Sequence, residues 1–171
     1  MAVDEVVQRG ADVLVLGDLG IGNTTISAAL ATFLAEVPLE HSVGRGTGVD
    51  DAGLARKRAA VEAAVARCAG ITDPLEVLRE LGGSEQVALA AACVRARRHR
   101  VTVLLDGYVV AAAMLPVAGS LAHCLAGHVS AEPGHRFVLE HVGLRPILDL
   151  DLRLGEGTGA IAALPLLEIA C

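Results

Sequence analysis

Residues 12–25, DVLVLGDLGIGNTT, decide the fold. The first five form a short β-branched and leucine-rich run that ends at a glycine, as a buried parallel strand does. GDLGIGNTT follows as a glycine loop, and the apolar, alanine-rich residues 26–35 then read as a helix, with Asn23 or Thr24 placed to cap it. This order of strand, loop and helix predicts the first unit of an α/β domain.

The same alternation continues to the end of the chain. Further strands are expected at residues 101–105 and 123–127, and residues 147–154 are a mixed stretch. Further helices are expected at residues 52–69, 74–81, 84–99, 108–117, 135–141 and 160–170. Strands alternating with helices predict a mostly parallel sheet covered on both faces, a three-layer α/β/α Rossmann-like fold in one domain over residues 1–171.

Composition narrows the class of protein and its partners. Hydrophobic residues make up 53% of the chain and aromatic residues 2%, so the core must be built from Ala, Val and Leu. With 14 Lys and Arg against 20 Asp and Glu, the formal charge is −6, which disfavours a nucleic-acid surface. The N-terminal sequence MAVDEVVQRG lacks the basic start of a signal peptide, so a cytoplasmic protein is expected.

The cysteines predict reduced core thiols. Cys68, Cys93, Cys124 and Cys171 are widely spaced, with no CxxC and no paired Cys/His spacing for zinc, so no metal site is expected from them. The histidines at positions 128, 135 and 141 have no acidic partner at ligand spacing either.

Residues 107–129 contain no Asp, Glu, Lys or Arg and are long enough to span a bilayer. Pro116, Gly119 and Ser120 interrupt the stretch, and VTVLLD before it reads as a buried strand. We prefer a helix, a turn and a strand inside an α/β core, with a transmembrane segment as the alternative.

Three glycine clusters, GDLGIG, GRGTG and GEGTG, could carry chemistry. Backbone N–H groups at a helix start suit an anion such as phosphate, although glycine turns are also common in α/β domains. No cluster has the P-loop or the GxGxxG spacing. Asp18 and Glu156 lie inside two of the clusters, where a carboxylate is either a general base or a helix cap. Lys57 is the only lysine in the chain. Its compact positive charge suits a phosphate, although an exposed lysine on a helix is normally just solvated.

Several of these motifs, in the same order, resemble segments of the nicotinate-nucleotide–dimethylbenzimidazole phosphoribosyltransferase family. They are GDLGIGNTT, GRGTGVDDAGLARKRAAV, DPLEVLRELGG, VTVLLDGYVVAAA, AGHVSAEPGH and LRLGEGTGAIAALPLLEIA. The resemblance covers almost the whole chain and implies that it lacks the family's N-terminal half. It also implies a cytoplasmic homodimer of cobalamin biosynthesis that needs no cofactor or metal.

By the resemblance, the reaction converts nicotinate mononucleotide and 5,6-dimethylbenzimidazole into α-ribazole 5′-phosphate and nicotinate. Glu156 matches the family's general base, and Asp18 stands with Leu19 where the family usually has Glu-Met. Phosphate, ribose and substrate binding are expected at Leu19, Gly20, Gly22, Asn23, Thr24, Gly44, Gly46, Lys57, Leu154 and Gly155. Two alternatives stay open: a catalytically incomplete nucleotide-binding or phosphate-binding module, and a truncated fragment that needs a partner chain.

Overall fold

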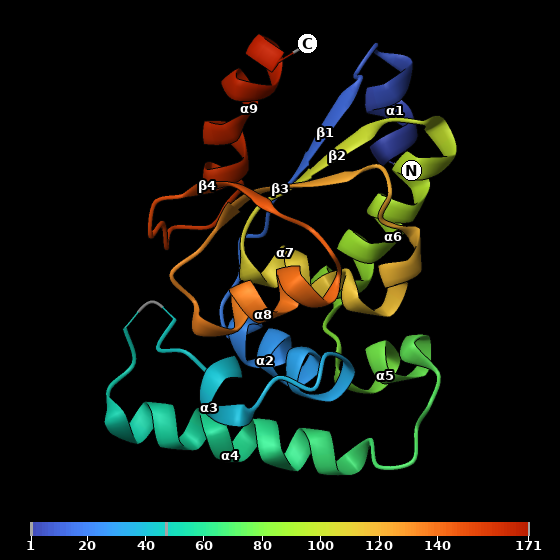
Figure 1. The fold of residues 1–171 in the computed structure, drawn as a ribbon. Coiled ribbons are helices and arrows are strands. Elements are labelled where there is room, and N and C mark those ends of the chain that lie inside the picture. Colours follow the sequence, from blue (N-terminus) through green and yellow to red (C-terminus); the bar gives the residue numbers. More distant parts are fainter. Residues whose placement is uncertain (1, 47, 171) are drawn as a thin grey trace.

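A parallel sheet forms the centre of the protein. The computed structural model describes residues 2–46 and 48–170 (Figure 1). The sheet holds β1 (Val13–Leu16), β2 (Thr102–Leu105), β3 (Cys124–Val129) and β4 (Pro146–Asp149). They lie side by side in chain order, and each neighbouring pair is parallel. The predicted α/β fold with a parallel sheet is confirmed.

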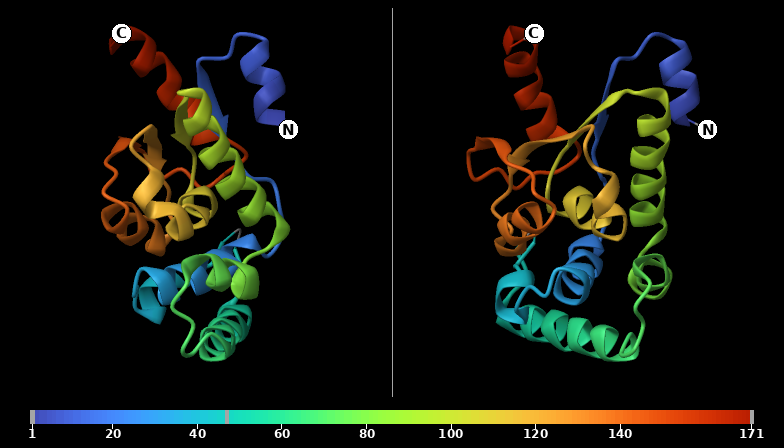
Figure 2. Two further views of the ribbon diagram at one scale, coloured as in Figure 1. Left: turned by 90° about the vertical axis from the view of Figure 1, so that its right-hand side faces the viewer. Right: turned by 45° about the vertical axis from the view of Figure 1, so that its right-hand side comes forward.

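Helices surround the sheet. Those before β2 are α1 (Ala2–Gln8), α2 (Asn23–Leu34), α3 (Leu39–Ser42), α4 (Asp51–Arg67), α5 (Pro74–Leu81) and α6 (Ser84–His99). Those after β2 are α7 (Tyr108–Ala113), the 3-10 helix η1 (Leu115–Ser120), α8 (Pro133–His141) and α9 (Thr158–Ala170). The views in Figures 1 and 2 place α2, α3, α4 and α5 together beyond the carboxyl ends of the strands.

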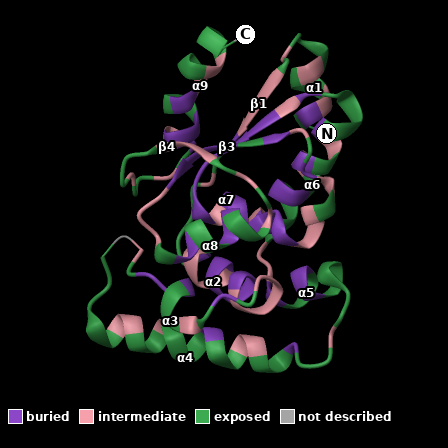
Figure 3. Ribbon diagram, in the orientation of Figure 1, coloured by how far each residue is buried: buried purple, intermediate pink, exposed green. Residues whose placement is uncertain are grey.

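Strand β2 is packed on both faces of the sheet, where its alternate side chains point to opposite sides. On one face Val103 and Leu105 pack in a core with residues of α1, α6 and α7. On the other face Leu104, which lies between them, packs with Ala160 and Ala163 of α9. A strand packed on both faces needs apolar side chains at successive positions, as the run TVLL of β2 provides. Figure 3 shows the result, with β2 and α7 buried and the outer side of α4 exposed.

Most predicted elements are found within a few residues of the expected bounds. Asp73 caps α5 as expected, accepting a hydrogen bond from the Leu75 N–H at 2.9 Å. The cap predicted for α2 is wrong, since the N-cap is Gly22 and makes no side-chain bond, while Asn23 is the first helical residue. The helix expected at residues 108–117 ends at Ala113 and continues as η1, which has proline in its first turn. The short helices α1 and α3 were not predicted.

The fold tests two further expectations, on the cysteines and on the long apolar stretch. Cys68, Cys93 and Cys124 are free and buried, and Cys171 lies outside the described residues. The apolar stretch 107–129 forms α7, η1 and β3. Among the helices that the structure describes, none is long and apolar enough to cross a membrane.

The packing of α9 on the sheet predicts a sharp cost for one methyl group. A Cβ at Gly127 would lie 2.6 Å from the Ala160 Cα and 3.1 Å from the Leu105 carbonyl oxygen. Because those atoms belong to backbone inside the core, Gly127→Ala should lower the free energy of unfolding by about 1–3 kcal/mol. Denaturant unfolding measures the change.

Gly119→Ala is the matched control, since a Cβ there meets nothing within 4 Å. An unchanged midpoint in Gly127→Ala, or an equal loss in both variants, would contradict the packing described.

Candidate active site

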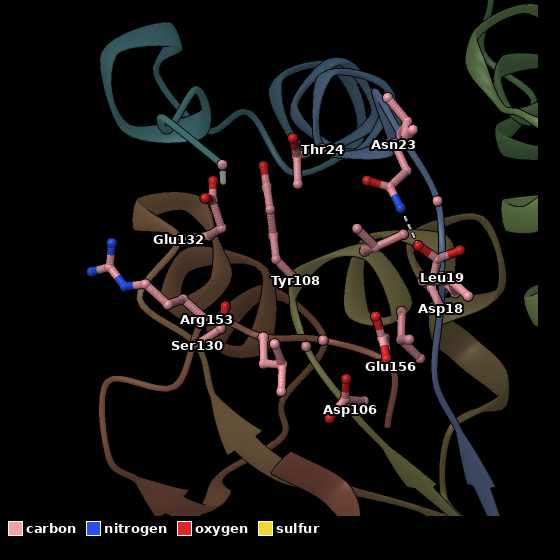
Figure 4. Close-up of a pocket in the computed structure, with 18 of the residues that line it drawn as sticks. Asp18, Leu19, Asn23, Thr24, Asp106, Tyr108, Ser130, Glu132, Arg153 and Glu156 are labelled. Carbon is pink, nitrogen blue, oxygen red and sulfur yellow. Dashed lines mark hydrogen bonds between the residues drawn. The ribbon is translucent and has the colours of Figure 1, made fainter. Parts of the chain in front are cut away.

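A cavity of about 270 Å³ opens at the carboxyl ends of the strands. Five stretches line it: the loop after β1 with the start of α2, the loop between α3 and α4, the residues after β2, the end of β3 with its following loop, and the loop before α9. Figure 4 shows side chains from these stretches turned toward one space. Ligands of open parallel sheets bind at this edge, so the position agrees with the fold.

The structure brings most of the predicted site residues together here. Those that line the cavity are Asp18, Leu19, Gly20, Gly22, Asn23, Thr24, Gly46, Leu154, Gly155 and Glu156. Gly44 lines a neighbouring cavity of about 290 Å³, which shares Gly46, Glu132 and Arg153 with the first. Lys57 lines neither cavity.

Lys57 instead joins two of the glycine loops. Its ammonium donates hydrogen bonds to the Thr24 Oγ1 and to the Gly44 carbonyl oxygen, both at 2.9 Å. Burial lowers the pKa of Lys57, and the nearby charge of Glu132 partly opposes this. The lysine therefore holds the second loop against the start of α2 and leaves a cation directly behind the cavity wall.

The loop that carries Glu156 has an unusual backbone. Gly155, Glu156 and Gly157 have φ values of 81°, 60° and 83°, so three successive residues lie in the left-handed region. Glycine adopts this region freely, whereas a glutamate there is strained. Strain of this kind persists only where surrounding contacts hold it, and it gathers at functional sites.

Two backbone contacts join this loop to the loop after β1. The Glu156 N–H donates to the Asp18 carbonyl oxygen at 3.1 Å. A Cβ at Gly17 would lie 2.4 Å from the Gly157 nitrogen, so only glycine permits this approach. The two acidic residues singled out from the sequence therefore flank one edge of the cavity (Figure 4).

Asp106, which follows β2, fixes the Glu156 loop from below. Its carboxylate is 2% exposed and accepts hydrogen bonds from the N–H groups of Gly157 at 3.1 Å and Ala160 at 3.0 Å. Burial works to raise the pKa of Asp106, but the His128 ring and these two N–H groups outweigh it, so the pKa is lowered. An ionised carboxylate at the start of α9 also interacts favourably with the helix dipole.

Asp18 has a different environment. Its carboxylate accepts a hydrogen bond from the Asn23 side-chain amide, which lowers the pKa, but partial burial and the charge of Glu85 prevail and raise it. Asn23 thus holds Asp18 rather than capping α2. Because Gly22 has no side chain to offer, the first N–H groups of α2 receive no capping side chain.

The cavity also holds residues to which the sequence assigned no role. Asp106, Tyr108, Ser130, Glu132 and Arg153 all line it. The Glu132 Oε2 is buried without a hydrogen-bond partner among the described residues. Unpaired buried polar atoms beside a cavity are positions where ligand or water is expected. In the sequence, Asp106, Ser130 and Glu132 follow predicted strands, Tyr108 begins a predicted helix, and Arg153 lies in the mixed stretch 147–154.

His128 is a further buried residue of the cavity wall. It lines the cavity at 2% exposure, and its Nε2 lies 3.4 Å from an Asp106 oxygen. Neither ring nitrogen makes a hydrogen bond within the described chain.

Comparison with known proteins agrees with the geometry. The family model described as "Phosphoribosyltransferase" matches residues 1–171. Proteins named nicotinate-nucleotide–dimethylbenzimidazole phosphoribosyltransferase are similar: that of Thermus thermophilus is 50% identical, covering 99% of this chain and 52% of its own, and that of Methylocella silvestris is 50% identical, covering 97% and 50%. A crystal structure of CobT from Thermus thermophilus superposes with a TM-score of 0.92 at 50% identity, covering 99% of this chain and 52% of that one.

The chain therefore belongs to the nicotinate-nucleotide–dimethylbenzimidazole phosphoribosyltransferase family. It spans about half the length of the curated relatives that it matches. The family expectation drawn from the ordered motifs is confirmed.

One buried histidine under the cavity predicts a pH dependence of stability. The Ser130 N–H donates to the His135 Nδ1 at 2.8 Å, and burial lowers the pKa of His135 to about 3. In the unfolded chain an ordinary histidine binds a proton below about pH 6.5. Between about pH 6.5 and 4 the unfolded state then binds more protons than the folded state. The free energy of unfolding should therefore decrease as the pH is lowered through this range, by up to about 1.4 kcal/mol per pH unit.

His135→Asn, whose amide oxygen can accept the same N–H, should flatten the curve in that window. His141→Asn is the control, because His141 is exposed on the same helix. Denaturant titrations at several pH values give the slopes, and equal slopes in wild type and His135→Asn would disprove the assignment.

Proposed function

We propose that this chain carries the phosphoribosyl-transfer site of a nicotinate-nucleotide–dimethylbenzimidazole phosphoribosyltransferase. The reaction moves phosphoribose from nicotinate mononucleotide to 5,6-dimethylbenzimidazole and yields α-ribazole 5′-phosphate and nicotinate. The observation that carries the proposal is the Glu156 loop, whose strained backbone is bonded to Asp18 and Asp106 at one edge of the cavity.

The phosphate and ribose of the donor are assigned to the glycine loops. The first N–H groups of α2, free of a capping side chain, and the glycines beside them let an anion approach the backbone. Lys57 adds a positive charge behind this wall while bonded to Thr24 and Gly44. The assignment to phosphate and ribose covers Gly20, Gly22, Asn23, Thr24, Gly44, Gly46 and Lys57, and Leu19, Leu154 and Gly155 complete the proposed substrate-binding residues.

Glu156 is assigned as the general base. One benzimidazole nitrogen attacks the anomeric carbon as the bond from that carbon to the nicotinate nitrogen breaks, and the proton on the other benzimidazole nitrogen passes to the carboxylate. Attack from the face opposite the leaving group converts the β configuration to α. Asp106 positions the base through the Gly157 N–H, and Asp18 completes the acidic edge. Nicotinate leaves with a neutral pyridine nitrogen, so its departure needs no help from a metal or cofactor.

The acceptor base is assigned to the apolar mouth of the cavity. Leu19, Ile21 and Leu154 line the cavity and are 82%, 104% and 69% exposed. A flat aromatic base covering them would remove apolar surface from water at about 25 cal/mol per Å².

The proposal extends to a homodimer that acts in the cytoplasm. On α9, Ile161, Leu166 and Ile169 expose 58%, 45% and 82% of their surface, which a second chain could cover. Free buried thiols agree with a reducing compartment.

Replacement of the base should separate catalysis from binding. Glu156→Gln keeps the size of the side chain but cannot take a proton, so the turnover number should fall at least about 100-fold while the dissociation constant for nicotinate mononucleotide stays near its original value. Nicotinate release from the full chain with both substrates measures turnover, and calorimetry measures binding. Glu140→Gln, an exposed change on α8, is the control.

Unchanged turnover in Glu156→Gln would remove Glu156 from this role. If the wild-type chain binds the mononucleotide but releases no nicotinate, the transferase proposal fails and the binding-module alternative stands.

Lys57 should matter for binding of the phosphate. Lys57→Met removes the cation and its two bonds, so the dissociation constant for nicotinate mononucleotide should rise about 10- to 100-fold, in line with the loss of a charged hydrogen bond. Inorganic phosphate should compete with the mononucleotide in wild type and lose that effect in the variant. Arg58→Met, an exposed cation one position on, is the control, and equal affinities in wild type and Lys57→Met would refute the assignment.

A further inference from the structure

A second cluster of chemically active side chains lies at the other end of β3. Cys93 comes from α6, Cys124 is the first residue of β3, and His123 directly precedes it. The candidate active site lies at the opposite end of the same strand, where His128 and Ser130 line the cavity. Nothing in the proposed transferase chemistry uses the cluster.

The three donor atoms form a nearly equilateral triangle. The sulfurs of Cys93 and Cys124 are 3.4 Å apart, and the His123 Nε2 lies 3.7 Å from the first and 3.8 Å from the second. A tetrahedral zinc with Zn–S bonds of about 2.3 Å and Zn–N bonds of about 2.0 Å has donor separations of about 3.8 and 3.5 Å. Each observed side is within a few tenths of an ångström of these values.

The surroundings also suit a soft cation. Cys93 is fully buried and Cys124 is 4% exposed, so neither thiol has water to solvate a thiolate. Two thiolates and one divalent ion are neutral together, which removes the cost of burying charge. His123 is only partly buried, and this leaves a path for the ion and a place for water as the fourth ligand.

We propose that Cys93, His123 and Cys124 form a binding site for Zn²⁺. Binding releases two thiol protons and forms two Zn–S bonds and one Zn–N bond, with water in the fourth position. The Nε2–H now donates to the Cys93 carbonyl oxygen at 3.0 Å. When the metal binds, this proton moves to Nδ1 through solvent, so that Nε2 offers its lone pair to Zn²⁺ and the ring stays neutral. Since α6 and β3 are far apart in the sequence, the ion would clamp the long helix to the central strand.

Metal titration of the full chain tests the site directly. Reduced, chelator-treated protein should bind one equivalent of Co²⁺ with a thiolate charge-transfer band, and Zn²⁺ should displace the Co²⁺. Zn²⁺ should also raise the melting temperature of the wild type, because an ion that binds only the folded state stabilises it. His123→Ala should weaken Zn²⁺ affinity at least about 100-fold, as expected when one ligand in three is lost.

Controls separate the cluster from general thiol chemistry. Cys68→Ser removes a fully buried thiol elsewhere and should bind Zn²⁺ like the wild type. Cys93→Ser and Cys124→Ser should lose binding, and if either fails to fold, His123→Ala still decides the question because His123 is partly exposed.

Three results would overturn the proposal: no stoichiometric binding at micromolar metal, affinity unchanged in His123→Ala, or loss of binding in Cys68→Ser. Mass spectrometry of the purified chain adds a fourth. A disulfide between Cys93 and Cys124, with no metal uptake after reduction, would make the pair a redox site instead.

Discussion

The architecture of the candidate active site depends on one buried carboxylate. Asp106 stands at the end of the second strand and receives the N–H groups of Gly157 and Ala160, which belong to the far end of the chain. Without these bonds, two backbone donors at the start of α9 would be buried unpaired, at a cost of about 1–3 kcal/mol each. The same bonds hold Glu156 in its left-handed conformation. Sheet, helix and strained loop are thus fixed by a single side chain.

Close backbone approach is the second condition, and it explains where glycine is needed. The loop after β1 meets the Glu156 loop at Gly17, and α9 meets β3 at Gly127, where any Cβ would lie within 2.4 and 2.6 Å of backbone atoms. These contacts place α9 tightly on the sheet, so its N-terminus reaches Asp106. An alanine-rich core with few aromatic side chains suits this arrangement, because small side chains let helix and strand come close.

Local sequence patterns predicted most of the helices and strands. The features that they missed depend on contacts between residues that are distant in the sequence. The apolar run TVLL of β2 and the Asp73-Pro74 start of α5 can each be recognised from a few neighbouring residues. The partner of Asn23 is not, since its amide turns back to Asp18 instead of capping its own helix. The hydrogen bonds of Asp106 to the Glu156 loop could not be predicted from the sequence either, because they join positions about fifty residues apart. The pairing of Cys93 with Cys124 cannot be predicted for the same reason, since tertiary packing brings these two residues of α6 and β3 together.

The two sides of the cavity differ in a way that bears on how the proposed reaction would be organised. The donor side is built from backbone N–H groups, a fixed lysine and loops bonded to each other, so little ordering remains to be done when a phosphate binds. The mouth is apolar and open, with Ile21 fully exposed. Such a surface gives affinity only when something covers it, and apolar contact discriminates weakly between ligands of similar shape. The proposed reaction would therefore depend on a strict geometry of the ribose and of Glu156, the general base. Selectivity for the acceptor would depend on whatever completes the apolar wall.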